Sequence, residues 1–149
     1  MAFFNSNDIS ASGLSAQRLR MDVIAENIAN ANTTRAKNGG PYKRKTVTFE
    51  ERPNVTKFSS SLNDALSRRV EGRGVRVRRI AEDDSLGPRV YDPAHPDSDN
   101  DGYVEMPNVN IVTEMVNMIS ASRAYEANVT ALSTSKTMTA KTLEISNSR

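Results

Sequence analysis

The chain has 149 residues, the length of one ordinary domain, and 37% of them are hydrophobic. It contains no cysteine and one histidine, which excludes disulfides, a cysteine nucleophile, a thiolate metal site and a site with two histidine ligands from one chain. The net charge of +2 is unevenly spread, because residues 1–80 carry 15 Lys and Arg against 7 Asp and Glu, whereas residues 81–149 carry 5 against 11. We expect no transmembrane helix and no cleavable signal peptide, since no long apolar run and no basic start are present.

A long helix is predicted over residues 6–32. The segment has no proline and one glycine, and Leu14, Met21, Ile24 and Ile28 recur at the spacings of one helical stripe. A residue of the run Asn5–Asn7 is a suitable N-cap. The run Asn38-Gly39-Gly40-Pro41 then ends the helix.

The middle of the chain, residues 35–107, is predicted to be a small region rich in strands and loops. It holds most of the glycines and all six prolines. Strands are indicated near residues 42–49 and 74–78, and the second is expected to pair with residues 87–91. Leu62 and Leu66 indicate one or two helical turns.

A second long helix is predicted over residues 111–146, which contain neither glycine nor proline. Ile111, Met118, Tyr125 and Leu132 lie seven residues apart and indicate a narrow heptad seam. The same seam is expected to include an adjoining row of residues, Met115, Val129 and Leu143. Val116 and Ile119 are expected to extend it. Asn108 or Asn110 is a suitable N-cap, because Pro107 prevents extension backward.

The predicted fold is therefore mainly α with a small β and irregular middle. The long N- and C-terminal helices are expected to pair as a coiled-coil hairpin, so that residues 1–34 and 108–149 form one discontinuous helical domain. Their seams are thin, and isolated helices need tertiary partners. We expect the two ends to pack on each other and then on other copies or other proteins.

The sequence contains only weak signals for a metal, catalytic or phosphate-binding site. Residues 97–102 resemble the first half of a calcium loop, but position twelve would be Asn108 instead of a bidentate glutamate, which favours an acidic turn. His95 lies in the same loop without a nucleophile motif, and a turn-fixing role is favoured. The arginine-rich residues 68–79 could contact phosphate, but no nucleic-acid motif accompanies them. We expect no catalytic residue, metal or cofactor.

The asparagines near the ends of the helices have two interpretations. Asn27, Asn30 and Asn32 follow one another closely, and Asn128 lies in the second long helix. On a seam, asparagine fixes the register and number of partners at some cost in stability. The same residues could instead be exposed caps and fraying positions.

The two ends resemble the signatures of the bacterial flagellar rod and hook family. Residues 11–18 and 27–33 are similar to its N-terminal signature, and residues 122–128, Ser-Arg-Ala-Tyr-Glu-Ala-Asn, to its C-terminal one. Four inner stretches resemble rod members: residues 39–44, 91–97, 102–104 and 107–109. Residues 53–70 match no known pattern.

The resemblance implies a non-enzymatic structural subunit of the proximal rod of the flagellar basal body. Such subunits assemble with themselves and other rod proteins into a tubular drive shaft around the export channel. Further implied partners are membrane-ring or adapter proteins at the rod base and the flagellar type III export apparatus. The implied location is the periplasm or cell-envelope space, reached without a cleaved signal. No small-molecule substrate or nucleic acid is implied.

An alternative that starts from the charge alone is a basic helical-hairpin module that binds nucleic acid or an anionic surface. Under the rod interpretation, the helical stripes, the asparagines and the family signature together give a candidate assembly interface. Its residues are Leu14, Met21, Ile24, Asn27, Ile28, Asn30, Asn32, Met115, Met118, Arg123, Tyr125, Asn128, Val129, Leu132 and Leu143.

Overall fold

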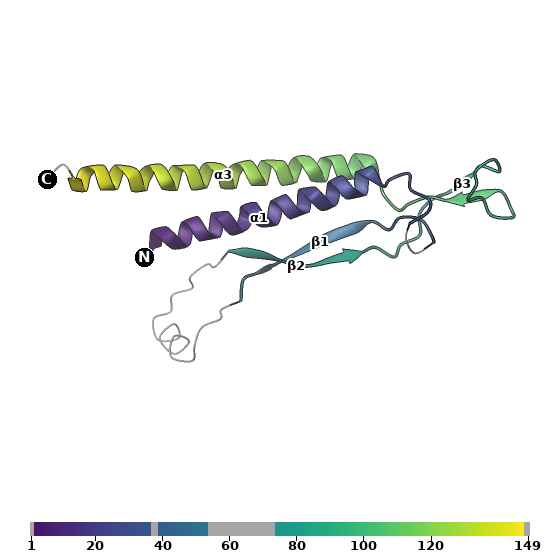
Figure 1. Ribbon diagram of the computed structural model, residues 1–149, viewed down its shortest axis with the longest axis horizontal. Coiled ribbons are helices and arrows are strands. Elements are labelled where there is room, and N and C mark those ends of the chain that lie inside the picture. Colours follow the sequence, from purple (N-terminus) through teal and green to yellow (C-terminus); the bar gives the residue numbers. More distant parts are fainter. Residues whose placement is uncertain (1, 37–38, 54–73, 148–149) are drawn as a thin grey trace.

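A computed structural model describes residues 2–36, 39–53 and 74–147 (Figure 1). The elements in chain order are α1 (Ala2–Ala29), β1 (Lys45–Glu51), β2 (Val75–Glu82), β3 (Arg89–Tyr91), β4 (Tyr103–Glu105) and α3 (Ile111–Asn147). This confirms a mainly helical chain with a small antiparallel middle. The helical turns predicted around Leu62 and Leu66 lie outside the described residues.

The two helices differ in how well their ends were predicted. α3 begins where expected, and Asn110 caps it, because the Thr113 N–H donates to Asn110 Oδ1 at 3.1 Å. α1 begins at Ala2, so the expected caps at Asn5–Asn7 are wrong: these residues lie inside the helix. It ends at Ala29 instead of residue 32, and a hydrogen-bonded turn follows, with the Thr33 N–H donating to Asn30 O at 3.1 Å.

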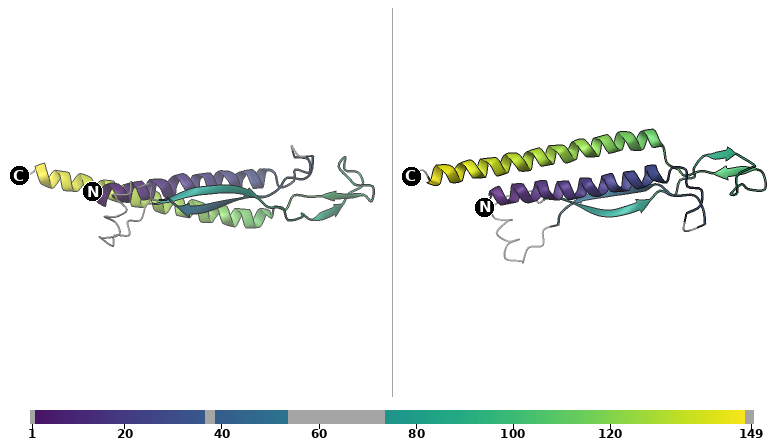
Figure 2. Two further views of the ribbon diagram at one scale, coloured as in Figure 1. Left: turned by 90° about the horizontal axis from the view of Figure 1, so that it is seen from below. Right: turned by 45° about the horizontal axis from the view of Figure 1, so that its top comes forward.

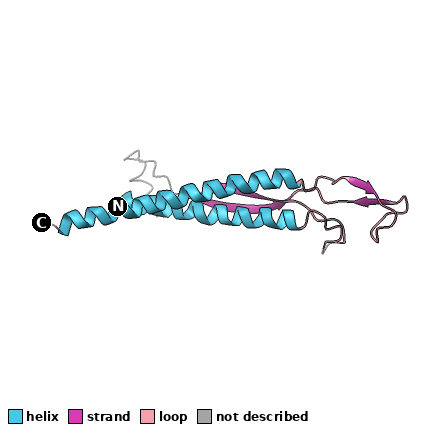
Figure 3. Ribbon diagram, turned by 90° about the horizontal axis from the view of Figure 1, so that it is seen from above, coloured by secondary structure: helices cyan, strands magenta, loops and turns pink. Residues whose placement is uncertain are grey.

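The molecule is a slender stack of three layers, with α1 in the middle. α3 lies antiparallel along one side of α1, and the ribbon of β1 and β2 lies along the other (Figures 1 and 3). Between the described elements, the ribbon contacts α1 but not α3. α3 is nine residues longer than α1, about 13 Å at the helical rise, and its C-terminal end extends past the start of α1.

The strand pairing differs from the prediction. β2 pairs with β1, from Lys45↔Glu82 to Glu51↔Val75, and β3 pairs with the unpredicted β4. The expected pairing of residues 74–78 with residues 87–91 is therefore wrong. β4 has three residues, too few to show an alternating pattern.

Small residues set the spacing of the layers. A Cβ built on Gly13 would lie 2.9 Å from Asn128 Oδ1, so α1 and α3 approach closely there. On the ribbon side, Gly74 has a φ of +84°, and the Ser12 hydroxyl accepts a hydrogen bond from the Val75 N–H at 3.0 Å. Buried apolar side chains are accordingly few: Ala16, Val23, Ile24, Ala31, Tyr42, Val104 and Ala121.

We predict that Gly13→Leu destabilises the protein by about 1–3 kcal/mol, because the side chain enters occupied space between the helices. The matched control is Ser15→Leu, an exposed position on α1, which should change the free energy of unfolding by less than about 0.5 kcal/mol. Thermal unfolding followed by circular dichroism measures both. Equal melting temperatures would contradict the close approach.

Candidate assembly interface

A buried polar junction joins α1, α3 and the start of β1. At its centre is Asn27, whose side chain is 1% exposed. Its Nδ2 donates to Lys45 O at 2.8 Å and to Glu114 Oε2 at 3.0 Å, while its Oδ1 accepts from the Lys45 N–H and the Tyr42 hydroxyl, both at 2.9 Å. Both donors and both acceptor positions of this amide are therefore satisfied.

Glu114 brings α3 into the junction. Its side chain is also 1% exposed, and its Oε1 accepts from Arg44 Nε at 3.0 Å and Nη2 at 2.7 Å. Burial opposes the charge, but hydrogen bonds from Asn27 and Arg44 and the guanidinium charge outweigh it and lower the pKa of Glu114. The carboxylate is thus held ionised inside the protein.

Asn108 attaches the segment before α3 to the same junction. Its Oδ1 accepts from the Arg44 N–H at 2.7 Å, and its Nδ2 donates to Asp83 O at 2.9 Å. The neighbouring Tyr42 is buried, and this burial, with nearby carboxylates, raises the pKa of Tyr42 to about 12. Residues 42–45 are therefore hydrogen-bonded to α1, to α3, to the segment before β3 and to the segment after β4.

The interface residues predicted from the sequence divide by exposure in the single chain. Ile24 and Asn27 are buried. The half-buried residues are Leu14, Met21, Ile28, Asn30, Met118, Tyr125, Asn128 and Leu132. The exposed residues are Asn32, Met115, Arg123, Val129 and Leu143. Met118, Tyr125 and Leu132 are thus half-buried as one row, but Ile111, which was expected to begin that row, is 42% exposed. Met115, Val129 and Leu143 of the adjoining row are also exposed.

The start of α3 carries an uncovered apolar face, which we call the α3 outer face: Val112, Met115, Val116 and Ile119. These four side chains are 54–70% exposed. Their spacing of three and four residues places them on one side of the helix. In the single chain, Val116 and Ile119 do not extend the half-buried row of Met118, because they lie about 200° and 100° around the helix from it. Ile119 follows Met115 by one turn, as the sequence indicated, whereas Val112 was not part of the expected seam.

The sequence also missed the roles of Glu114 and Arg44. Glu114 had the signature of an exposed first-turn carboxylate, which suits any helix start. Arg44 belongs to the basic run Lys43-Arg44-Lys45, which is typical of an exposed segment. No local sequence pattern distinguishes this buried ion pair from exposed charged residues, because Arg44 and Glu114 are 70 residues apart in the chain.

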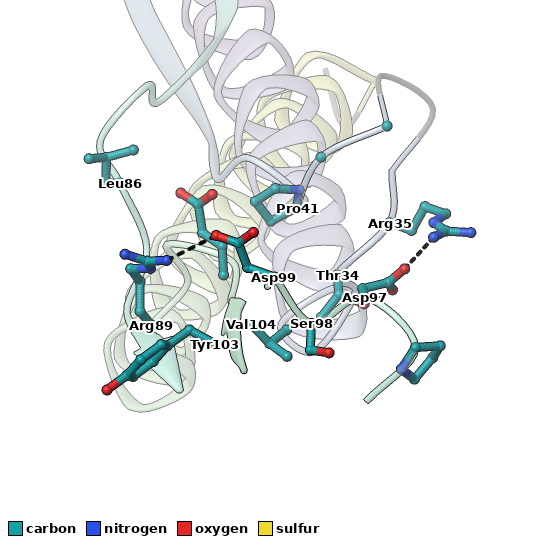
Figure 4. Close-up of a pocket in the computed structure, with 14 residues that line it drawn as sticks. Thr34, Arg35, Pro41, Leu86, Arg89, Asp97, Ser98, Asp99, Tyr103 and Val104 are labelled. Carbon is teal, nitrogen blue, oxygen red and sulfur yellow. Dashed lines mark hydrogen bonds and ion pairs between the residues drawn. The ribbon is translucent and has the colours of Figure 1, made fainter. Parts of the chain in front are cut away.

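The far end of the molecule is a polar tip formed by β3, β4 and the loop between them (Figures 1 and 2). Asp97 turns back toward the loop after α1, where it pairs with Arg35 and accepts from the Thr34 hydroxyl at 2.8 Å (Figure 4). His95 Nδ1 accepts from the Asp97 N–H at 3.1 Å, which confirms its turn-fixing role. In the described part of the chain, no cluster of His, Asp or Glu has metal-site geometry, and neither helix is apolar enough over 18 residues to cross a membrane.

We predict that Glu114→Gln lowers the free energy of unfolding by about 1–3 kcal/mol at pH 7, because Arg44 loses a charged acceptor. Since folding lowers the pKa of Glu114, its contribution is full above the ordinary value of about 4.3 and is lost as the pH falls below it. The difference between wild type and variant should shrink between about pH 5 and pH 3.

Glu144→Gln is the control, because Glu144 pairs with Lys141 on the exposed surface of α3 and should change little. Urea unfolding at several pH values measures both variants. A difference between wild type and Glu114→Gln that is independent of pH would contradict the ionised junction.

Both ends of the chain match known protein families, and nearly its full length aligns with known proteins. Residues 8–37 match the family described as flagella basal body rod protein, and residues 100–145 match the C-terminal family of flagellar basal body rod FlgEFG proteins. The chain is 50% identical over 150 residues to the flagellar basal-body rod protein FlgC of Borreliella burgdorferi, 49% to that of Bacillus subtilis and 41% over 145 residues to that of Salmonella typhimurium. Each alignment covers 97% of this chain and 98–99% of the relative. The chain therefore belongs to the FlgC family of flagellar basal-body rod proteins.

Proposed function

We propose that the chain is a structural subunit of the proximal rod, where it assembles with itself and with other rod proteins into a tubular drive shaft around the export channel. Its full-length similarity to rod proteins supports a structural subunit of the basal body. The observation that carries the proposal is the α3 outer face, because a contiguous exposed apolar surface marks a site of protein association. The work is mechanical, without a catalytic step.

The helical pair is proposed to act as a coiled-coil domain made of residues 1–34 and 108–149, with residues 35–107 as a separate small region. Two cross-contacts support this: Gly13 faces Asn128, and Asn27 bonds Glu114. The contacts are fourteen residues apart on both helices, which is two heptads and the repeat expected when helices supercoil. Met118, Tyr125 and Leu132 keep the same repeat.

The candidate interface would then have two parts. Residues buried or half-buried between α1 and α3, such as Ile24 and Leu132, hold the pair together. Exposed members, such as Met115, Val129 and Leu143, would contact neighbouring subunits. Leu143 supports this division, because the pairing of Gly13 with Asn128 and of Asn27 with Glu114 places the first residue of α1, Ala2, opposite residue 139 of α3, before Leu143.

The remaining partners and the location follow from the same assignment. We propose contacts with membrane-ring or adapter proteins at the rod base and passage through the flagellar export apparatus without a cleaved signal, into the periplasm or cell-envelope space. The nucleic-acid alternative has no support from the relatives. Two arginines of β2 are moreover occupied, since Arg76 and Arg78 both lie beside Glu50.

We predict that deleting the gene abolishes the rod and motility, and that Val116→Asp fails to restore them. The carboxylate would be buried without a partner in the assembled rod, which is costly. Thr113→Asp is the control, an exposed position one turn earlier where a negative charge suits the helix start. Imaging of basal bodies in the complemented deletion strain measures rod assembly.

Wild type and Thr113→Asp should restore rods and swimming. Circular dichroism of purified Val116→Asp should match wild type, because Val116 is 61% exposed in the single chain. Complete rods in the deletion strain would contradict the proposed function. Rods with Val116→Asp would contradict the role of the α3 outer face.

A further inference from the structure

The outer side of the β1–β2 ribbon gathers arginines. The register shifts between Thr48 and Phe49, so that Arg78 is an extra residue opposite the partner strand. Such a bulge breaks the strict alternation of side chains and leaves Arg76, Arg78 and Arg79 all exposed. Glu50 lies beside Arg76 and Arg78, but Arg79 has no ion-pair partner among the described residues. We call these three residues the arginine face.

The tip carries the opposite charge. Asp92, Asp99, Asp101 and Glu105 are exposed there, and neither Asp101 nor Glu105 has an ion-pair partner within the described part of the chain. The exposed ring of Tyr91 adds an aromatic surface beside Gly102, the chain neighbour of Asp101, since a Cβ built on Gly102 would lie 2.9 Å from that ring. We call this surface the acidic tip.

The tip already holds one guanidinium. Arg89 lies 5.3 Å over the ring of Tyr103 and 3.5 Å from Asp99 (Figure 4). An aromatic face with a carboxylate beside it suits the planar, weakly hydrated guanidinium better than an ammonium. Tyr91 packs edge-on against Tyr103 at a centroid distance of 5.2 Å, and its exposed ring lies beside Gly102, the residue that follows Asp101 in the chain.

The two surfaces do not meet within one chain. β2 makes no contact with β3 or β4 in the described structure. β2, the strand that carries the arginine face, lies on the flank of the molecule beside α1, whereas β3, β4 and the loop between them form its end (Figures 1 and 2). A copy displaced along the long axis could bring its tip to the flank of its neighbour.

We propose that the arginine face of one copy binds the acidic tip of a second copy of this chain. The inference rests on the proposed function, because it requires copies to lie side by side in an assembly. Exposed ion pairs add little affinity each, so the contact sets the orientation and order of docking more than its strength. Single charge changes are therefore mild.

Cross-linking tests the contact directly, because the wild-type chain has no cysteine. Two differently tagged variants, Arg79→Cys and Asp101→Cys, are expressed together in the deletion strain, and isolated basal bodies are treated with a short bismaleimide. The expected result is a cross-linked product that carries both tags. The control replaces Asp101→Cys by Glu144→Cys, which is also an exposed carboxylate but lies near the C-terminal end of α3, and this pair should give no product.

Absence of the two-tag product in assembled basal bodies would overturn the proposal, as would an equal yield with Glu144→Cys. A product that joins Arg79→Cys to a different flagellar protein would overturn the second-copy assignment. If wild type itself does not restore rods, the proposed function fails, which is a separate result.

Charge exchange gives a second measurement if a cysteine variant does not assemble. Arg78→Glu with Arg79→Glu should reduce swimming, and adding Asp101→Lys with Glu105→Lys in the same chain should restore part of it. The local repulsion that the new carboxylates make with Glu50 cannot be relieved by changes at the tip, so restoration reports the contact between copies. No loss in the first variant, or no recovery in the combined one, contradicts the proposal.

Discussion

The structure depends on the hydrogen bonds of one buried amide. Asn27 pairs with the backbone of Lys45 in the way a neighbouring strand would, and it also donates to Glu114. These bonds attach the start of the ribbon and the start of α3 to the same turn of α1. Unpaired, each buried polar group would be costly, so the junction is stable only when all its members are present. It therefore selects one arrangement of three segments that are distant in the sequence.

The slender shape follows from what packs beyond the junction. The layers meet through Ser12, Gly13, Ala16 and Ala121, which are too small to build a thick core. Small residues bring the backbones close but bury little apolar surface. The larger apolar side chains at the start of α3 remain uncovered, and their burial in an assembly would supply hydrophobic free energy that the single chain lacks. We therefore expect a subunit built in this way to gain stability on assembly.

Much of the fold could be predicted from the sequence because helix signals are local. The absence of proline and glycine, the cap at Asn110 and the heptad row through Tyr125 determine α3 to within a residue. The strand pairing could not be predicted, since β1 and β2 come together across a long intervening segment and β4 is three residues long. A local sequence pattern can indicate a strand, but it does not show which distant strand will pair with it.

The candidate site shows the same division. The stripe that contains Ile24 was visible as periodicity. For Asn27 the sequence left a packing role and an exposed position both open, and its burial and four hydrogen bonds favour the packing role. The burial of Glu114 was not visible, because an acidic residue in a first helical turn usually faces water. Its partner Arg44 is 70 residues earlier in the chain, and only folding brings them together.

Hydrogen exchange in wild type and Asn27→Ala tests the central claim most directly. If the junction joins three segments, the variant should lose amide protection together at the turn of α1 around Asn27, in β1 near Lys45 and in the first turns of α3 around Glu114. Ser15→Ala, an exposed position on the same helix, should change none of the three. Loss of protection confined to α1, with β1 and the start of α3 unchanged, would contradict the account.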